Sequence, residues 1–203
     1  MKIGPKYKIA KRLGAQVFDK TQTQKFQLSE ARSGKKVGRR FGNKSEYSRQ
    51  LLEKQKVRFS YYVSERQFKN YVKKAMDTTG ANPSEALYMS LETRLDNTIY
   101  RMGFAPTRQA ARQMVSHGHI LLNGRRVKSP SFTVGKGDVV SVRGGSRTSS
   151  LFTDLAEKLK DFKSPEWFLF DTEKLEGTVV ALPKYDKVLS HFDLSPVLEY
   201  YSR

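Results

Sequence analysis

Apolar residues change their spacing between residues 93 and 142, and the change predicts two helices followed by short strands. They recur at helical spacing as far as Gly103, which ends the first helix. A second helical repeat begins behind Thr107, a residue type suited to an N-cap, and stops at Gly118. The apolar positions of these two helices are Leu95, Ile99 and Met102, then Ala110, Ala111, Met114 and Val115.

From residue 120 the pattern alternates with a period of two, which is typical of strands. The dipeptide Asn123-Gly124 separates residues 120–122 from residues 125–127 and predicts a β-hairpin with a type I′ turn. A glycine-rich turn then leads into a further short strand at residues 139–142.

The stretch from Ser45 to Met102 is helical in its pattern. Ser45 can cap a first helix, and Ser64 with Gln67 three residues later forms a capping box for a second. A third helix opens at Asn82, and its apolar stripe continues to Met102. The pattern therefore predicts one continuous helix of some 20 residues, roughly 30 Å long.

The C-terminal third contains shorter signals. Leucines at spacing four predict a helix over residues 151–162. Residues 167–170 are a short apolar run, and a second run at 177–182 is typical of a strand. The final run, residues 194–201, is expected to pack on the helical part, so that the first and last segments come together.

We therefore predict an α+β protein with three parts. Residues 1–44 form an extended basic N-terminal segment, since they have few large apolar residues and no sustained period. Residues 45–92 plus 157–203 form a mainly helical domain. Residues 93–156 form an inserted module of two helices and antiparallel strands. The first segment is expected to be mobile in the free protein and to become ordered on a partner.

The charge distribution points to a polyanion as that partner. The net charge is +18 and the pI is about 10.0. Residues 91–150 hold ten Lys and Arg against three Asp and Glu, and residues 1–60 hold 17 against four. Residues 161–203 hold five against eight, so this end is expected to pack on the protein or to face elsewhere.

Several other classes of protein are disfavoured. There is no apolar run of 18 residues and no apolar signal at the N-terminus, so neither a membrane partner nor a secretory signal is expected. The chain has no cysteine, which excludes disulfides and thiolate sites. Its three histidines, His117, His119 and His191, do not form a recognisable ligand set, so no metal and no cofactor is expected.

Residues 93–142 resemble the RNA-binding module named after protein four of the small ribosomal subunit. The match rests on RLDNTIYRMGF, TRQAARQMVSHGHILLNGRRV and GDVVSV. The flanks resemble the bacterial-type protein-four family itself, in GPKYKIAKRLG, KSEYSRQLLEKQKVRFSYYVSERQF, PEWF and LEYYSR. Some members build an N-terminal zinc site from cysteines, so this chain resembles the zinc-free form.

The resemblance implies a structural constituent of the small ribosomal subunit rather than an enzyme. It implies direct, early binding to the 5′ domain of the small-subunit (16S) rRNA, which nucleates assembly. It also implies a ribosome-bound position in the cytoplasm, near the channel through which mRNA enters and beside ribosomal protein five, with a contribution to translational accuracy. Small-subunit rRNA, ribosomal protein five and, as a candidate, mRNA are the implied partners, and no small-molecule substrate is implied.

Two other functions remain open from the sequence. One is a free RNA-binding translational regulator. The other is an RNA-modifying enzyme, because Arg94-Leu95-Asp96 resembles the Arg-Leu-Asp of pseudouridine synthases. Since the tripeptide lies inside the module's first helix, we expect Asp96 to pair with Arg94, Arg101 or a turn backbone instead, and no catalytic residue is predicted.

The candidate RNA-contacting residues are mainly cations, because a phosphate backbone is their natural partner. Arg108 and Arg112, for example, are four apart and share one helix face. The rRNA candidates are Lys6, Lys8, Lys11, Arg12, Arg39, Arg40, Lys44, Lys54, Lys56, Arg58, Arg66, Arg94, Arg101, Arg108, Arg112, His117, Asn123, Arg125, Arg126 and Lys128. The mRNA candidates are Lys35, Lys36, Arg39, Arg40 and Lys44.

Aromatic residues within and just after the helix that Ser45 is predicted to cap have two interpretations. Tyr47, Phe59, Tyr61 and Tyr62 can stack on unpaired bases or pack in the core. Their helical spacing favours the core.

Overall fold

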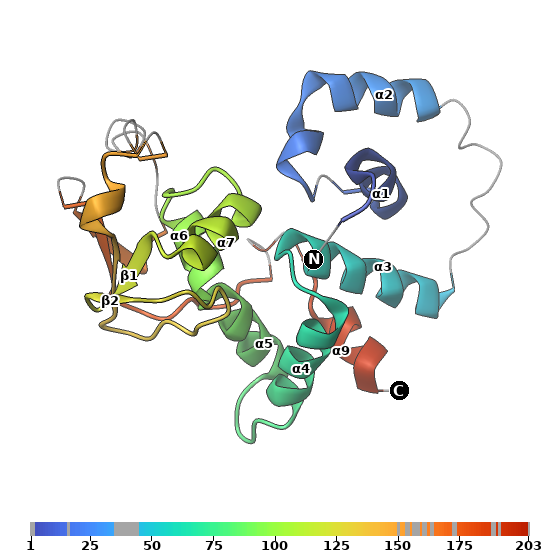
Figure 1. Ribbon diagram of the computed structural model, residues 1–203. Helices are drawn as coiled ribbons and strands as arrows, with labels where there is room; N and C mark the ends of the chain where they lie inside the picture. Colours follow the sequence, from blue (N-terminus) through green and yellow to red (C-terminus); the bar gives the residue numbers. More distant parts are fainter. Residues whose placement is uncertain are drawn as a thin grey trace. The chain divides into compact units, whose positions relative to one another are not determined.

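The computed structural model divides the chain into two compact units, shown in Figure 1. The first contains residues 1–87 and 185–203, and the second contains residues 88–184. The structure describes residues 3–15, 17–34, 45–149, 151, 152, 155, 159, 162, 165–171, 174–187, 190 and 192–202.

The first unit is helical in its described residues. Ser45 and Ser64 cap α3 and α4 as predicted, because their hydroxyls accept hydrogen bonds from the backbone N–H of Ser48 and Gln67. Asn82 caps α5 through a bond from the backbone N–H of Ser84. The elements are α1 (Lys6–Leu13), η1 (Asp19–Gln22), α2 (Gln24–Gly34), α3 (Glu46–Ser60), α4 (Glu65–Met76), the beginning of α5 (Pro83–Glu92) and α9 (Ser195–Ser202).

The last helix of the chain packs against α3 and α4, as predicted. Gln50 donates a 2.9 Å hydrogen bond to Glu199, and the Tyr201 hydroxyl donates one of 2.7 Å to Glu65. Val197 is fully buried. Figure 1 shows α9 beside α3 and α4, so the C-terminal residues complete a unit that begins near the N-terminus.

The prediction of an extended N-terminal segment is wrong for the residues that are described. α1, η1 and α2 surround a small apolar cluster of Ala10, Phe18 and Phe26. The Tyr7 ring contacts Phe26 with a 5.2 Å centroid separation, and Phe59 from α3 contacts Phe18. Phe59 lies about forty residues beyond Phe18 in the sequence, and a contact between such distant residues leaves no local periodicity. The sequence pattern therefore did not show this core. Residues 35–44 lie outside the described part.

The second unit packs two helices on an antiparallel sheet, which confirms the α+β class. In its described residues five strands form one sheet in the order β2-β1-β3-β5-β4, with neighbouring strands antiparallel. The elements are α6 (Leu95–Arg101), α7 (Arg108–His117), β1 (Ile120–Leu122), β2 (Arg125–Arg126), β3 (Val139–Val142), η3 (Gly144–Ser146), β4 (Phe168–Asp171) and β5 (Glu176–Val179).

The hairpin and the helix before it form as predicted. Asn123 and Gly124 both have positive φ, 51° and 75°, as a type I′ turn requires. Thr107 caps α7 by accepting a 3.0 Å hydrogen bond from the backbone N–H of Ala110. α7 ends at Gly118, whose φ of 73° is left-handed.

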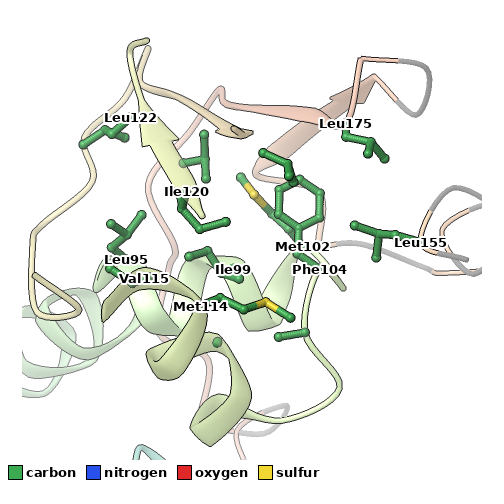
Figure 2. Packing of buried hydrophobic residues seen from close by; sticks show 14 of the residues in the cluster. Leu95, Ile99, Met102, Phe104, Met114, Val115, Ile120, Leu122, Leu155 and Leu175 are labelled. Atoms are coloured by element: carbon green, nitrogen blue, oxygen red, sulfur yellow. The ribbon is translucent and has the colours of Figure 1, made fainter. Parts of the chain in front are cut away.

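The core of the second unit lies between the two helices and the sheet. Figure 2 shows Leu95 and Ile99 of α6 and Val115 of α7 facing Ile120 of β1, and all four are fully buried. The cluster also includes residues of β4 and β5, and β5 pairs directly with β3. These two strands therefore belong to the second unit, whereas the sequence placed residues 157–203 in the helical domain. Pairing between distant strands carries no local signal.

The predicted continuous helix is interrupted at Thr93 and Arg94. α5 ends at Glu92, and Arg94 has extended backbone angles and forms an isolated bridge with Thr133. The backbone N–H of Leu95 donates to the Phe132 carbonyl at 2.8 Å. The apolar stripe persists across the break, so the spacing of leucines alone could not reveal it.

The predicted helix over residues 151–162 lies largely outside the described residues. Leu155 and Leu159 of its predicted apolar face are buried in the core of the second unit, whereas Leu151 is 54% exposed. None of the helices in the described part of the chain is both long and apolar enough to cross a membrane.

Candidate RNA-binding surface

Two of the three acidic side chains of residues 88–149 are buried, and the third is held in a surface turn. This stretch contains three, Glu92, Asp96 and Asp138, and none of them is fully exposed. Glu92 and Asp96 are 1% and 4% exposed, and Asp138 accepts bonds from Asn123 and from the backbone N–H of Gly135. The charge left on the surface of this part of the module is therefore cationic.

Arg94 is buried and paired internally, so the structure does not support its prediction as an RNA contact. It is 1% exposed, and its Nε and Nη2 donate to the two oxygens of Asp96 at 3.0 and 2.7 Å. Asp96 also accepts a 2.9 Å bond from the backbone N–H of Asn97. The tripeptide therefore forms an internal ion pair, as we expected in place of catalysis. Sequence position alone does not distinguish this arginine from its exposed neighbours.

The other arginines of α6 and α7 keep part of their surface. Arg101 and Arg112 have side chains that are 35% exposed, and Arg108 is half-buried. Arg108 lies over the Tyr100 ring at 4.4 Å. Cations held at a surface in this way can approach a phosphate.

Arg126 connects the hairpin to the end of α7. Its Nε donates to the Gly118 carbonyl at 3.0 Å, and its Nη2 donates to the His117 carbonyl at 2.8 Å. The C-terminal carbonyls of a helix favour a cation, because they carry partial negative charge. Arg126 remains exposed, so it can be anchored and still contact RNA.

Arg125 and Lys128 are the most accessible candidates near the hairpin. Both are exposed, on β2 and just after it. Asn123 instead has a structural role in the turn, since its amide donates to Asp138 and its carbonyl oxygen accepts from the backbone N–H of Val139.

Two exposed cations beside η3 were also not singled out by the sequence interpretation. Arg143 and Arg147 flank η3 and are exposed, and Arg147 donates to the Lys174 carbonyl at 2.6 Å. The excess of basic residues between 91 and 150 included both of them. No motif marked them, which is why they were not named.

His117 is exposed at the end of α7, and its ring lies 6.0 Å from that of His119. His119 Nδ1 is 3.0 Å from the Ser146 hydroxyl. Among the residues that the structure describes, no group of three or more potential ligands is placed to hold a metal ion.

Lys54 in the first unit is also buried and paired, so the structure does not support its prediction as an RNA contact. It is 4% exposed, pairs with Glu65 at 2.7 Å and lies over the Tyr200 ring at 4.5 Å. Arg58 has a side chain that is 16% exposed and lies 3.5 Å from the second Glu65 oxygen. Lys56 pairs with Glu53 at 2.6 Å. The α3 cations therefore mainly stabilise the helical unit.

The hydrogen bonds around Glu65 also change its acidity. Burial opposes its ionisation, but hydrogen bonds from Lys54 and Tyr201 and the charges of Lys54 and Arg58 outweigh burial and lower its pKa. Burial and the bond to Glu65 raise the pKa of Tyr201, so its hydroxyl remains a donor.

The exposed candidates of the first unit are Lys8 and Arg12 on α1 and Arg66 on α4. Lys11 instead bonds the carbonyl and hydroxyl of Ser29 at 2.7 and 2.8 Å, and joins α1 to α2. Lys6 lies 5.8 Å from the centre of the Phe18 ring. The remaining candidates, Lys35, Lys36, Arg39, Arg40 and Lys44, lie outside the described residues.

The aromatic candidates are mainly part of the core, as their spacing favoured. Tyr61 is 3% exposed and Phe59 packs on Phe18. Tyr47 is the exception at 49% exposed, and its ring lies beside that of Tyr200. Tyr62 is half-buried with a φ of 56°.

An α+β module with paired acids and exposed cations is the arrangement expected of a protein class that binds a polyanion such as RNA. Family models extend this conclusion. Residues 93–140 match the S4 domain, and residues 1–92 match the Ribosomal protein S4/S9 N-terminal domain. The chain belongs to the uS4 family of small ribosomal subunit proteins, which confirms the resemblance seen in its sequence.

Individual relatives match over the whole length. The Small ribosomal subunit protein uS4 of Acinetobacter baumannii (strain ACICU) is 42% identical over 205 residues, covering 99% of this chain and 98% of the relative. The protein of the same name from Chloroflexus aurantiacus (strain ATCC 29366 / DSM 635 / J-10-fl) is 39% identical over 203 residues, with the same coverage. These names denote a ribosomal protein and no reaction, in agreement with the expectation that this protein is not an enzyme.

Proposed function

We propose that this protein binds small-subunit rRNA as a ribosome-bound structural constituent of the small subunit. The observation that carries the proposal is the burial of Glu92 and Asp96 and the pairing of Asp138 within its turn, which leave a cationic surface on a module of a ribosomal family. Such a surface attracts a phosphate backbone and releases its counterions.

The RNA contacts proposed for the second unit are selected cations that keep exposed surface. They come from α6, α7, the hairpin and η3. They are Arg101, Arg108, Arg112, Arg125, Arg126, Lys128, Arg143 and Arg147.

The first unit contributes Lys8, Arg12 and Arg66 in the same proposal, because these three side chains are exposed on α1 and α4. Arg94 and Lys54 are not part of it, because burial and ion pairs occupy them.

The finer assignments rest on family membership. We propose that the protein binds 16S rRNA early and nucleates assembly, and that it lies near the channel through which mRNA enters, beside ribosomal protein five. In this position it contributes to translational accuracy. The basic residues between 35 and 44 are proposed to contact mRNA, because their charge suits a single strand.

Fractionation of a cell lysate tests the proposal. The protein is expected to sediment with the small subunit at moderate salt, about 0.1 M, and to be released as salt rises toward about 1 M, where charge interactions are screened. A protein that stays in the light fractions at moderate salt would instead be a free RNA-binding regulator.

A further inference from the structure

Glu92 and Asp96 are buried in a module that is expected to bind a polyanion, and each carboxylate contacts more than one residue. A buried carboxylate destabilises the folded state unless it is paired and hydrogen-bonded, so the residues that pair with it matter for the fold. The partners of both acids include arginines that reach the surface.

Glu92 organises one end of this arrangement. Its two oxygens accept bonds from Arg101 Nη2 at 2.7 Å and Nε at 2.9 Å, which is a bidentate pair. The same carboxylate accepts a 2.8 Å bond from the Asn97 amide. Asn97 in turn accepts a 2.7 Å bond from Arg108 Nε, and Tyr100 supports Arg108 from its ring face.

Asp96 organises the other end. Arg94 neutralises it through two hydrogen bonds, and Arg112 Nη1 lies 3.5 Å from its Oδ2. Since Arg94 is fully buried, Arg112 is the partly exposed member of this group.

Two sets of residues follow from these contacts. The buried set is called the inner network and consists of Glu92, Asp96 and Asn97. The partly exposed set that it holds is called the guanidinium face and consists of Arg101, Arg108 and Arg112.

We infer that the inner network consists of positioning residues that hold the guanidinium face in a fixed orientation, as a preformed clamp for RNA phosphates. The inference rests on the proposed function and deepens it. It assigns a role in RNA binding to two acids and an amide that do not themselves touch RNA.

The physical reason is preorganisation. A long arginine side chain loses rotamer freedom when it binds, and that loss weakens binding. An arginine already fixed by a bidentate carboxylate has lost this freedom before RNA arrives. A guanidinium carries five N–H donors in one plane, so a side chain held by one carboxylate can still donate to a phosphate.

Charge alone predicts the opposite effect on rRNA affinity when one of these acids is neutralised. Removing a negative charge raises the net charge by one and should strengthen the binding of any polyanion. If Glu92 positions Arg101 and Asn97, its neutralisation should weaken binding instead. The direction of the change therefore distinguishes positioning from charge.

The test compares two full-length variants with equal net charge, titrated with transcribed small-subunit rRNA at fixed salt. Glu92→Gln removes one negative charge from the inner network, and Glu166→Gln removes one from an exposed acid just before β4. We expect Glu166→Gln to bind as tightly as the wild type or slightly more tightly. Glu92→Gln should bind about two- to tenfold more weakly, the effect of freeing one or more long side chains.

Arg101→Lys provides a second route that leaves the net charge unchanged. Lysine keeps the charge but cannot form the planar bidentate contact. Arg101→Lys should therefore lower the rRNA affinity to a similar extent as Glu92→Gln. The double variant should lose little more affinity than either single variant, because both substitutions remove the same interaction. Thermal unfolding shows which variants are folded at the temperature of the titration.

Equal affinity of folded Glu92→Gln and Glu166→Gln would overturn the inference. If Glu92→Gln does not fold, wild-type affinity in Arg101→Lys would overturn it, and so would fully additive losses in a folded double variant. Failure of the proposed function gives a different result, since the wild type itself would then not bind small-subunit rRNA.

Discussion

Gly118 shows how a single backbone position can control the placement of a side chain proposed to bind RNA. Its φ of 73° is in the left-handed region, and its carbonyl accepts the bond from Arg126. A Cβ at this position would overlap Arg126 Nε. Gly124 has nearly the same φ, 75°, but a Cβ there would meet nothing within 4 Å. The two glycines therefore separate backbone strain from displacement of Arg126.

We predict that Gly118→Ala and Gly124→Ala each lower the free energy of unfolding by about 1–2 kcal/mol, the cost of a left-handed non-glycine residue. Only Gly118→Ala should also displace Arg126, so its rRNA affinity should be about three- to tenfold lower than that of Gly124→Ala. Chemical denaturation and rRNA titration measure the two effects. Equal rRNA affinities would contradict a contact between Arg126 and RNA.

At the scale of single residues the sequence predicted the turn and cap chemistry but not the fate of each cation. Asn123, Gly124, Thr107 and Gly118 act through backbone geometry that is local to them. Arg94 is buried because of tertiary packing, which leaves no local signal, so in the sequence it could not be distinguished from the other basic residues.

Among the elements, α9 depends on a compact polar contact with α3 and α4. Tyr201 donates to Glu65, and Lys54 donates to the same carboxylate oxygen. Because these bonds lower the pKa of Glu65, the folded state favours its ionised form. Glu65 therefore contributes stability above its ordinary pKa of 4.5, and this contribution is lost as pH falls through the lowered value.

We predict that the free energy of unfolding falls more between pH 7 and pH 3 in the wild type than in Glu65→Gln, as measured by urea denaturation. The Glu65 side chain is 45% exposed, so solvent screening limits the difference to about 1 kcal/mol. Tyr201→Phe, which removes one bond to Glu65, should be intermediate. The same pH dependence in wild type and Glu65→Gln would contradict this assignment.

The elements themselves were predicted where local signals determine them. The hairpin, α7 and the caps of α3 and α4 have such signals, and all of them formed. The break at Arg94 and the apolar cluster around Phe26 depend on partners far along the chain, Thr133 and Phe59. These were missed for that reason.

On the scale of the whole molecule, the proposed function rests on the asymmetry of charge. The net charge of +18 could belong to any basic protein. What makes it specific is that Glu92 and Asp96 are buried and Asp138 is paired within a turn, while Arg125 and Lys128 remain exposed. Charge reversal at Arg108 and Arg112 is a poor test, because it would place new carboxylates beside Asn97 and Asp96.

The salt dependence of rRNA affinity tests the central claim most directly, in the wild type and in two double variants of equal charge. Arg125→Glu with Lys128→Glu alters the hairpin, and Lys73→Glu with Lys74→Glu alters exposed lysines of α4. In the wild type, log affinity should fall linearly with log salt, by roughly 10³- to 10⁵-fold between about 50 and 200 mM.

The hairpin variant should bind more weakly with a slope shallower by about two, one for each lost phosphate contact, and the α4 variant should keep nearly the wild-type slope. A flat salt response in the wild type, or equal losses in the two variants, would contradict RNA binding through the cationic surface of the module.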